Sequence, residues 1–167
     1  MPIRFDDPQP IDRAAVRTVE EQLGFDLPAE YVELLTGVSN GGSVEPAVFA
    51  DDLDIGVVGF LGVARADDWD LATRVAQYAG DLPDGLLPIA DAEGGNLVCT
   101  EVSGGRIGSI WFWDHERAED AARRVAASLD AFIEGLESYD NVDVAPEVES
   151  AYINPDFLAK LKREGKA

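Results

Sequence analysis

The chain has 167 residues, of which 46% are hydrophobic and 28% are charged, so it fits one packed domain with a short extension and is too apolar to be disordered throughout. Its 33 acidic residues against 13 lysines and arginines give a formal net charge of -20, which argues against binding to nucleic acids or anionic membranes, since both need a basic surface. Two interpretations of this charge stay open: a coat that keeps the protein soluble, or a surface that attracts a basic partner.

The sequence predicts neither export nor insertion into a membrane. The first residues lead into Asp6 and Asp7 without the apolar stretch of a signal peptide, and no apolar run approaches the roughly 18–20 residues that a membrane-spanning helix needs. The single cysteine, Cys99, excludes an internal disulfide, and the apolar sequence GNLVCTEV around it predicts a buried thiol. We therefore expect a cytoplasmic protein.

The N-terminal part of the chain predicts two short helices followed by a tight turn. From Ile11 to Leu23 every fourth residue is apolar, so these side chains share one helix face, and Gly24 ends the helix. A second helix begins at Pro28, because the missing N–H group of proline is tolerated in a first helical turn. The sequence SNGG at 39–42 then stops this helix, since asparagine and glycine adopt turn conformations that other residues resist.

The middle of the chain is less regular. The sequence LDIGVVGFLGV at 53–63 predicts a strand with a bend or bulge, since it combines β-branched residues with three glycines. Residues 67–80 predict a helix with acidic side chains in its first turn. Residues 81–95 contain two prolines and three glycines, and they predict a loop that delivers apolar side chains to the core.

Two strands, a long helix and a tail are predicted next. NLVCTEV at 96–102 and RIGSIWFW at 106–113 flank a short Ser-Gly-Gly turn, which predicts a β-hairpin. Residues 117–138 predict the longest helix, because apolar residues recur there at three- and four-residue spacing. Residues 138–167 predict an acidic linker and then a short C-terminal helix or tail, with Asn154 as its N-cap.

Motifs of enzymes and of metal sites are sparse in this sequence. It contains no glycine-rich phosphate-binding loop and no nucleophile elbow. One histidine and one cysteine cannot supply a common zinc site, and the acidic clusters at 51–54 and 67–70 lack the glycine turn and the distant glutamate of a calcium loop. We therefore expect no catalysis, no cofactor and no metal.

The best catalytic candidate is the sequence WDHE at 113–116, where His115 lies between two carboxylates and has the chemistry of a general base. Neighbouring residues on a strand point to opposite sides, so these carboxylates need not orient the imidazole, and a polar strand end is the favoured interpretation. Trp111 and Trp113 share one face of the strand. The sequence leaves open whether that face completes the core or forms an interaction surface.

The order of these motifs resembles that of the SUKH superfamily, and more narrowly its SMI/KNR-type branch, which contains bacterial immunity proteins and fungal regulators of cell-wall synthesis. The resemblance covers residues 10–137 and rests on LGFDLPAEYVELLTGVSNGG, LLPIADAEGGNLVCTEV, GSIWFWDHE and VAASLDAFIEGL in that order. It implies a single α+β domain in which helices pack against a curved, mostly antiparallel sheet. The matching positions with a structural role are Pro28, Asn40, Gly41, Gly42, Pro88 and Gly95.

The resemblance implies a protein that binds a partner rather than one that catalyses a reaction. In bacteria the typical member neutralises a cognate toxin, often a nuclease, and a nuclease needs a basic surface to hold phosphates, so the acidic balance favours a basic toxin. One alternative is a housekeeping regulatory or interaction module without a toxin partner, and another is a small enzyme or metal-binding protein that uses residues 113–116. The residues predicted to contact the partner lie near the ends of predicted strands and are Asp51, Asp52, Asp54, Asp91, Glu93, Asn96, Trp113, Asp114, His115 and Glu116.

Overall fold

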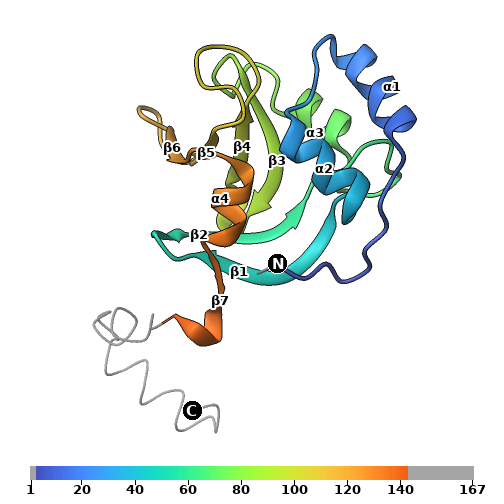
Figure 1. Ribbon diagram of the computed structural model, residues 1–167. Coiled ribbons are helices and arrows are strands. Elements are labelled where there is room, and N and C mark those ends of the chain that lie inside the picture. Colours follow the sequence, from blue (N-terminus) through green and yellow to red (C-terminus); the bar gives the residue numbers. More distant parts are fainter. Residues whose placement is uncertain (1–2, 143–167) are drawn as a thin grey trace, which may run out of the picture.

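A seven-stranded sheet organises residues 3–142, which are the residues that the computed structural model describes. Its strands follow the order β6-β5-β4-β3-β2-β1-β7, and each neighbouring pair is antiparallel. The sheet curls into a half-barrel (Figure 1). The strands are β1 (Gly42–Phe49), β2 (Asp52–Phe60), β3 (Leu86–Ala92), β4 (Leu97–Glu101), β5 (Ile110–Trp113), β6 (Ala122–Ala126) and β7 (Leu136–Ser138).

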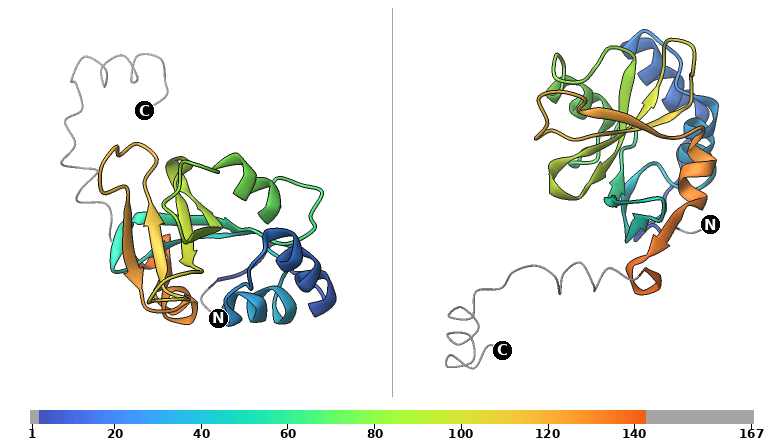
Figure 2. Two further views of the ribbon diagram at one scale, coloured as in Figure 1. Left: turned by 90° about the horizontal axis from the view of Figure 1, so that it is seen from above. Right: turned by 90° about the vertical axis from the view of Figure 1, so that its left-hand side faces the viewer.

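Helices pack against this curled sheet, as the α+β expectation required. Figures 1 and 2 show α4 in front of the concave face with α2 beside it, and α1 outside α2. The helix α3 lies against β3. The helices are α1 (Arg13–Leu23), α2 (Ala29–Gly37), α3 (Leu71–Gln77) and α4 (Leu129–Glu134), and two short 3-10 turns are η1 (Glu93–Gly95) and η2 (Tyr139–Asn141).

The larger core lies between the concave face and helices α1, α2 and α4. Phe60, Phe112 and Phe132 are among its largest fully buried side chains. Tyr31 of α2 is buried with them, and its hydroxyl donates a 2.6 Å hydrogen bond to the carbonyl of Leu61. Burial raises the pKa of the Tyr31 phenol, so this hydroxyl stays neutral and ties α2 to the chain that follows β2.

A smaller apolar cluster covers the opposite face of β4 and β5, because successive side chains on a strand point to opposite faces. Cys99 is fully buried there, which confirms the predicted core thiol, and burial raises the pKa of that thiol. Trp113 is 8% exposed and packs edge-on against Tyr78, with 5.5 Å between the ring centroids. Trp113 therefore completes a core, whereas Trp111 stays half-buried.

Several local predictions are confirmed. The two N-terminal helices are α1 and α2, and the side chain of Asp12 caps α1 by accepting a 2.9 Å hydrogen bond from the N–H of Ala15. Gly24 ends α1 at a φ of 84°, in the left-handed region that suits glycine. The predicted hairpin is β4 and β5, with Leu97 opposite Trp113.

The prediction of one long helix over 117–138 is wrong. This segment forms β6, then α4, then β7. Its first part, β6, pairs with β5, which would otherwise be an unpaired edge strand of the sheet. Ser128 then starts α4, because its side chain accepts a hydrogen bond from the N–H of Ala131. The apolar spacing fits a helix, but strand pairing with a distant segment overrides it.

Two further segments differ from the sequence prediction. Residues 81–95 contain β3 rather than only a loop, and Pro88 is tolerated in this strand because the β3–β4 register shifts between Pro88 and Ala90. The helix expected over 67–80 is limited to Leu71–Gln77, since Asp70 caps it. The prediction for 138–167 lies outside the described residues from residue 143 onwards. None of the helices in the described part is long and apolar enough to cross a membrane.

Replacing Phe132 by alanine tests how much the concave core contributes to stability. The ring is fully buried and lies 4.9 Å from the ring of Phe49, centroid to centroid, so Phe132→Ala should lower the free energy of unfolding by about 3–5 kcal/mol. Urea denaturation measures this loss. The control is Ala131→Ser on the exposed side of the same helix, which should change the value by less than about 1 kcal/mol, and equal effects of both variants would contradict the assignment.

Candidate functional site

Three loops lie at one end of the sheet, and together we call them the hairpin edge. They are the β1–β2 loop together with the first residues of β2 (50–54), the β3–β4 loop (93–96) and the β5–β6 loop (114–121). The antiparallel order of the strands brings them to the same end, although they are far apart in the sequence. The residues predicted to contact a partner lie in these loops or in the adjoining strand ends.

His115 is held by the β3–β4 loop rather than by a carboxylate. The Oδ1 atom of Asn96 accepts a 3.1 Å hydrogen bond from the backbone N–H of His115 and lies 2.7 Å from its ring Nδ1. The ring also packs over Gly95, where an added Cβ would lie 3.2 Å from Cε1, and the φ of 82° at Gly95 favours glycine there. The Asp114 carboxylate instead accepts a 3.0 Å hydrogen bond from the N–H of Glu116. This arrangement favours a fixed turn over a general base.

Asp52 is engaged within the fold. Its Oδ2 atom accepts hydrogen bonds from Nε (2.9 Å) and Nη2 (2.5 Å) of Arg123 on β6. The guanidinium of Arg123 lies over the ring of Phe112, 4.8 Å from its centroid. Because β2 and β6 are not neighbours in the sheet, this ion pair joins two strands that only the curl brings together.

Asp91 is also engaged, in an ion pair with Arg74 of α3. The two side chains are 20% and 14% exposed, respectively. Burial raises the pKa of the Asp91 carboxyl, and the charge of Arg74 opposes this shift. Arg74 donates a second hydrogen bond, of 2.8 Å, to the carbonyl of Asp68, so the pair holds α3 against the sheet.

Glu93 lies exposed at the turn between β3 and β4, against the end of the described chain. Its carboxylate and the hydroxyl of Tyr139 occupy the space that a Cβ at Gly56 would need. Burial and the neighbouring Glu93 raise the pKa of Tyr139 to about 12. The other hairpin-edge acids with exposed side chains are Asp51, Asp54, Glu116, Glu119 and Asp120, and the last two were not among the predicted contact residues.

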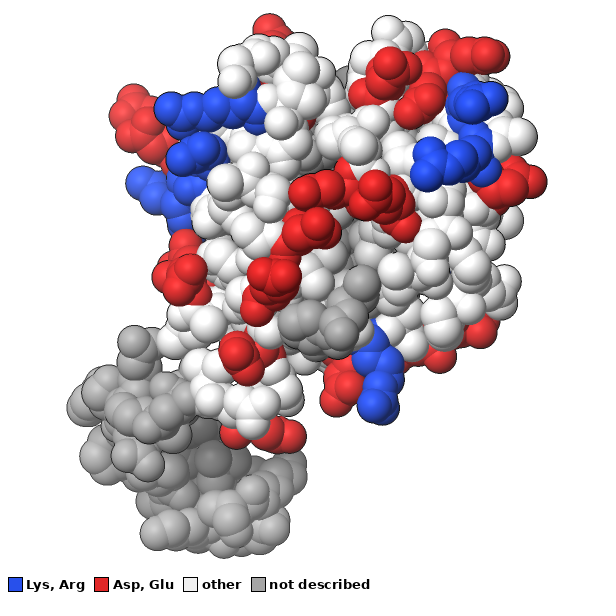
Figure 3. All heavy atoms as spheres, in the orientation of Figure 1, with Lys and Arg blue, Asp and Glu red and all other residues white. Residues whose placement is uncertain are grey.

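Sequence reasoning missed a second acidic surface. Figure 3 shows a row of acidic side chains across the face formed by α2 and α4. Glu30 and Glu33 lie on α2, Asp130 and Glu134 lie on α4, and the N–H of Asp130 donates a 3.1 Å hydrogen bond to Oε2 of Glu30. The acids on each helix were visible in the sequence, but contact between the helices is tertiary. Within residues 3–142, no group of three or more His, Cys, Asp or Glu is arranged to hold a metal ion.

The Asn-Gly-Gly motif has a structural role, because two backbone segments cross there. The side-chain amide of Asn40 accepts a 2.8 Å hydrogen bond from the N–H of Val63 and donates a 2.8 Å hydrogen bond to its carbonyl. Gly41 has a φ of 70°, and a Cβ there would lie 2.6 Å from the backbone N of Gly62. A Cβ at Gly62 would in turn overlap the carbonyl of Asn40.

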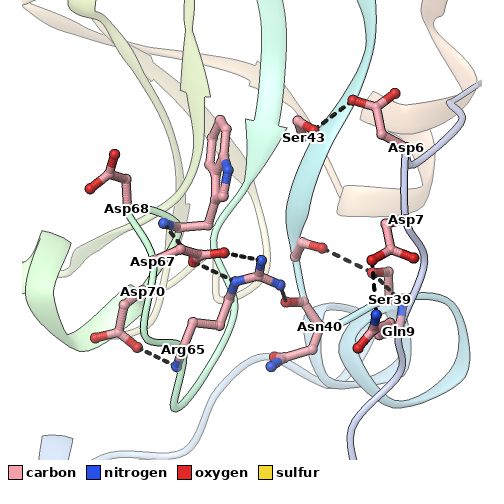
Figure 4. A network of polar contacts seen from close by, with 12 residues as sticks. Asp6, Asp7, Gln9, Ser39, Asn40, Ser43, Arg65, Asp67, Asp68 and Asp70 are labelled. Carbon is pink, nitrogen blue, oxygen red and sulfur yellow. Dashed lines mark hydrogen bonds and ion pairs between the residues drawn. The ribbon is translucent and has the colours of Figure 1, made fainter.

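Arg65 completes this crossing, as Figure 4 shows. Its guanidinium donates a 2.7 Å hydrogen bond to the carbonyl of Asn40 and pairs with Asp67. The hydrogen bond from Arg65 holds the pKa of the Asp67 carboxyl below its usual value. Asp70 accepts a 2.9 Å hydrogen bond from the backbone N–H of Arg65, so the loop between β2 and α3 is fixed at both ends.

Two comparisons relate the chain to known proteins. The model of the SMI1/KNR4 family (SUKH-1) matches residues 10–135. Over 58 residues the chain is 38% identical to the SPbeta prophage-derived uncharacterized protein YokK of Bacillus subtilis (strain 168). That segment covers 35% of this chain and 28% of the relative.

Replacing Asn40 by alanine tests the backbone crossing. The variant leaves the N–H and carbonyl of the buried Val63 without their side-chain partners, so the free energy of unfolding should fall by about 2–4 kcal/mol. Asn141→Ala, at an exposed position, is the matched control and should change it by less than about 0.5 kcal/mol. Urea denaturation measures both free energies of unfolding, and similar losses of stability in the two variants would contradict the structural role of Asn40.

A double-mutant cycle of Asp52→Asn and Arg123→Met tests the ion pair across the curl. The side chains of Asp52 and Arg123 are 24% and 35% exposed, so the coupling energy should be about 1 kcal/mol and should shrink as salt is added. The same cycle with Arg124→Met, which replaces an exposed neighbouring arginine, should give a coupling near zero. An equally large coupling energy between Asp52 and Arg124 would contradict a specific ion pair between Asp52 and Arg123.

Proposed function

Because the chain belongs to the SMI1/KNR4 family (SUKH-1), we propose that it is an immunity-type binding protein that neutralises a cognate toxin by direct contact. The membership confirms the resemblance that the ordered sequence motifs predicted. The curled antiparallel sheet with helices against it is the fold that this resemblance implied. The toxin itself, its basic character and its nuclease activity belong to the proposal.

The observation that carries the proposal, beside the family, is the formal net charge of -20. A nuclease toxin holds phosphates with lysines and arginines, and an acidic protein is attracted to that same surface. The attraction speeds encounter and depends on ionic strength, because it acts through long-range Coulomb forces. The same charge repels nucleic acids and anionic membranes, which supports a protein partner.

The chemistry of the two most reactive side chains supports binding rather than catalysis. The imidazole of His115 is oriented by the Asn96 amide, and no carboxylate polarises it among its hydrogen-bond partners in the described residues. Burial keeps Cys99 as a neutral thiol, which is a poor nucleophile. We therefore do not place a reaction at residues 113–116.

The contact residues predicted from the sequence divide into two roles within this proposal. Asp52 and Asp91 hold the fold through their ion pairs, and the buried ring of Trp113 supports the sheet from behind. The predicted contact acids with exposed side chains would face the toxin, where rim charges chiefly affect the association rate. These predicted acids are Asp51, Asp54, Glu93 and Glu116.

Co-expression tests the function. The chain is expressed with the toxin domain encoded beside its gene, and we expect restored growth of the host and a complex in a pull-down. A toxin that kills despite the chain and does not bind it would rule out the immunity role and favour the housekeeping module.

The triple charge reversal Asp51→Lys, Asp54→Lys and Glu116→Lys tests the hairpin edge. We expect the association rate constant, measured by surface plasmon resonance at low salt, to fall about tenfold, and its salt dependence to weaken.

The matched control makes the same change in net charge at exposed acids elsewhere, with Asp26→Lys, Asp81→Lys and Asp84→Lys. If the two triple variants slow association equally, only the total charge matters and the hairpin edge has no special role.

A further inference from the structure

An apolar groove opens at the end of β4 and β5 that lies opposite the hairpin edge. It forms where the start of α2, the β4–β5 loop and the start of α4 meet, and it has a volume of about 320 Å³. Its walls are mostly apolar and include Pro28, Ala29, Ile107, Gly108, Ala127 and Leu129.

Ile107 stands at the mouth of this groove with 63% of its surface exposed. Among the described residues, the other exposed large hydrophobic side chain is Leu53, which is 41% exposed and lies at the hairpin edge. Single exposed aliphatic side chains are common on protein surfaces. Ile107 differs in that a concave apolar wall continues from it, so a partner side chain placed there would lose contact with water on several sides.

The acidic row on α2 and α4 borders the same groove. Glu30 is part of the groove wall, and Asp130 follows directly after the wall residue Leu129. The sequences of α2 and α4 contain no lysine or arginine. Figure 3 shows this face with acidic side chains in a continuous row. The surface therefore complements an apolar side chain that is flanked by basic residues.

We propose that this groove anchors the toxin: it takes an aliphatic or aromatic side chain of the toxin, while the acids of α2 and α4 pair with lysines or arginines on either side. The inference rests on the proposed function, since it takes the occupant to be that basic toxin. Buried apolar anchors dominate binding energy and act mainly on dissociation. The groove then sets the lifetime of the complex, while the exposed acids of the hairpin edge set its rate of formation.

The variants Ile107→Ser and Leu53→Ser form a matched pair, because each removes one exposed aliphatic side chain, one at the groove and one at the hairpin edge. With the full chain and the toxin domain, we expect Ile107→Ser to speed dissociation about tenfold and Leu53→Ser to change it less than about twofold. Asp130→Lys should likewise weaken binding more than Asp140→Lys, at an exposed acid in the first turn of η2. Unchanged dissociation in Ile107→Ser, with its stability intact, overturns the anchor.

A probe without the toxin keeps this inference separable from the proposed function. The peptide Lys-Lys-Leu-Leu-Lys-Lys is titrated into the ¹⁵N-labelled full chain, and amide shifts should change at Ile107, Gly108 and the start of α4. The control peptides Lys-Lys-Ser-Ser-Lys-Lys and Glu-Glu-Leu-Leu-Glu-Glu should not change the chemical shifts of these amides. Shifts confined to the hairpin edge would overturn the groove as the apolar anchor.

Together, the two experiments distinguish a failure of the proposed function from a failure of the groove proposal. If the wild-type chain binds no toxin but the first peptide moves the groove amides, the proposed function fails and the groove chemistry stands. The chain itself ends in a basic segment with Lys160, Lys162, Arg163 and Lys166. If the peptide reaches the groove only after these residues are reversed to glutamate, that segment is the occupant and the toxin-anchor proposal is overturned.

Discussion

The curl of the antiparallel sheet decides where the core and both candidate surfaces lie. It closes far enough for Asp52 at the start of β2 to pair with Arg123 on β6, two strands that do not touch within the sheet. The concave side that results is deep enough to hold α4 with α2 beside it. The hairpin edge then forms at one end of the strands, and the groove beside Ile107 forms at the other. A flatter sheet would separate Asp52 from Arg123 and would leave α4 without a concave face to fill.

Glycines along and after β2 allow other segments to cross its outer side closely. A Cβ at Gly59 would overlap the ring of Trp69, and one at Gly56 would overlap the Tyr139 hydroxyl and the Glu93 carboxylate. Gly62 leaves room for the carbonyl of Asn40. The prediction of a bend from these glycines captured the irregular register of the strand, but the reason for each glycine is a neighbour from a distant part of the chain.

The acidic character divides into charges that hold the fold and charges that face solvent. Asp52, Asp67 and Asp91 are each paired with an arginine of the same chain. The remaining exposed acids supply the electrostatic field that would attract a basic toxin. Such a field raises the association rate but does not by itself give a long-lived complex. The proposed immunity role calls for both, and the apolar groove, bordered by acids that form no ion pair within residues 3–142, complements the hairpin edge. The hairpin-edge residues could be predicted from the sequence because they lie at strand ends. The groove forms where α2, the β4–β5 loop and α4 come into contact, and no local sequence pattern predicts that contact.

Sequence alone determined the helices α1 and α2, the β4–β5 hairpin and the family, because caps, turn residues and apolar periodicity act within a few neighbouring positions. Only the tertiary structure decided that residues 117–138 divide into β6, α4 and β7, since an apolar spacing that suits a helix lost to pairing with the open edge of β5. It also decided that Trp113 is core and that Trp111 is half-buried, because the covering side chains come from the region after α3. Strand pairing, ion pairs across the curl and helix contacts join residues distant in the chain, and their energies have no signature in local spacing.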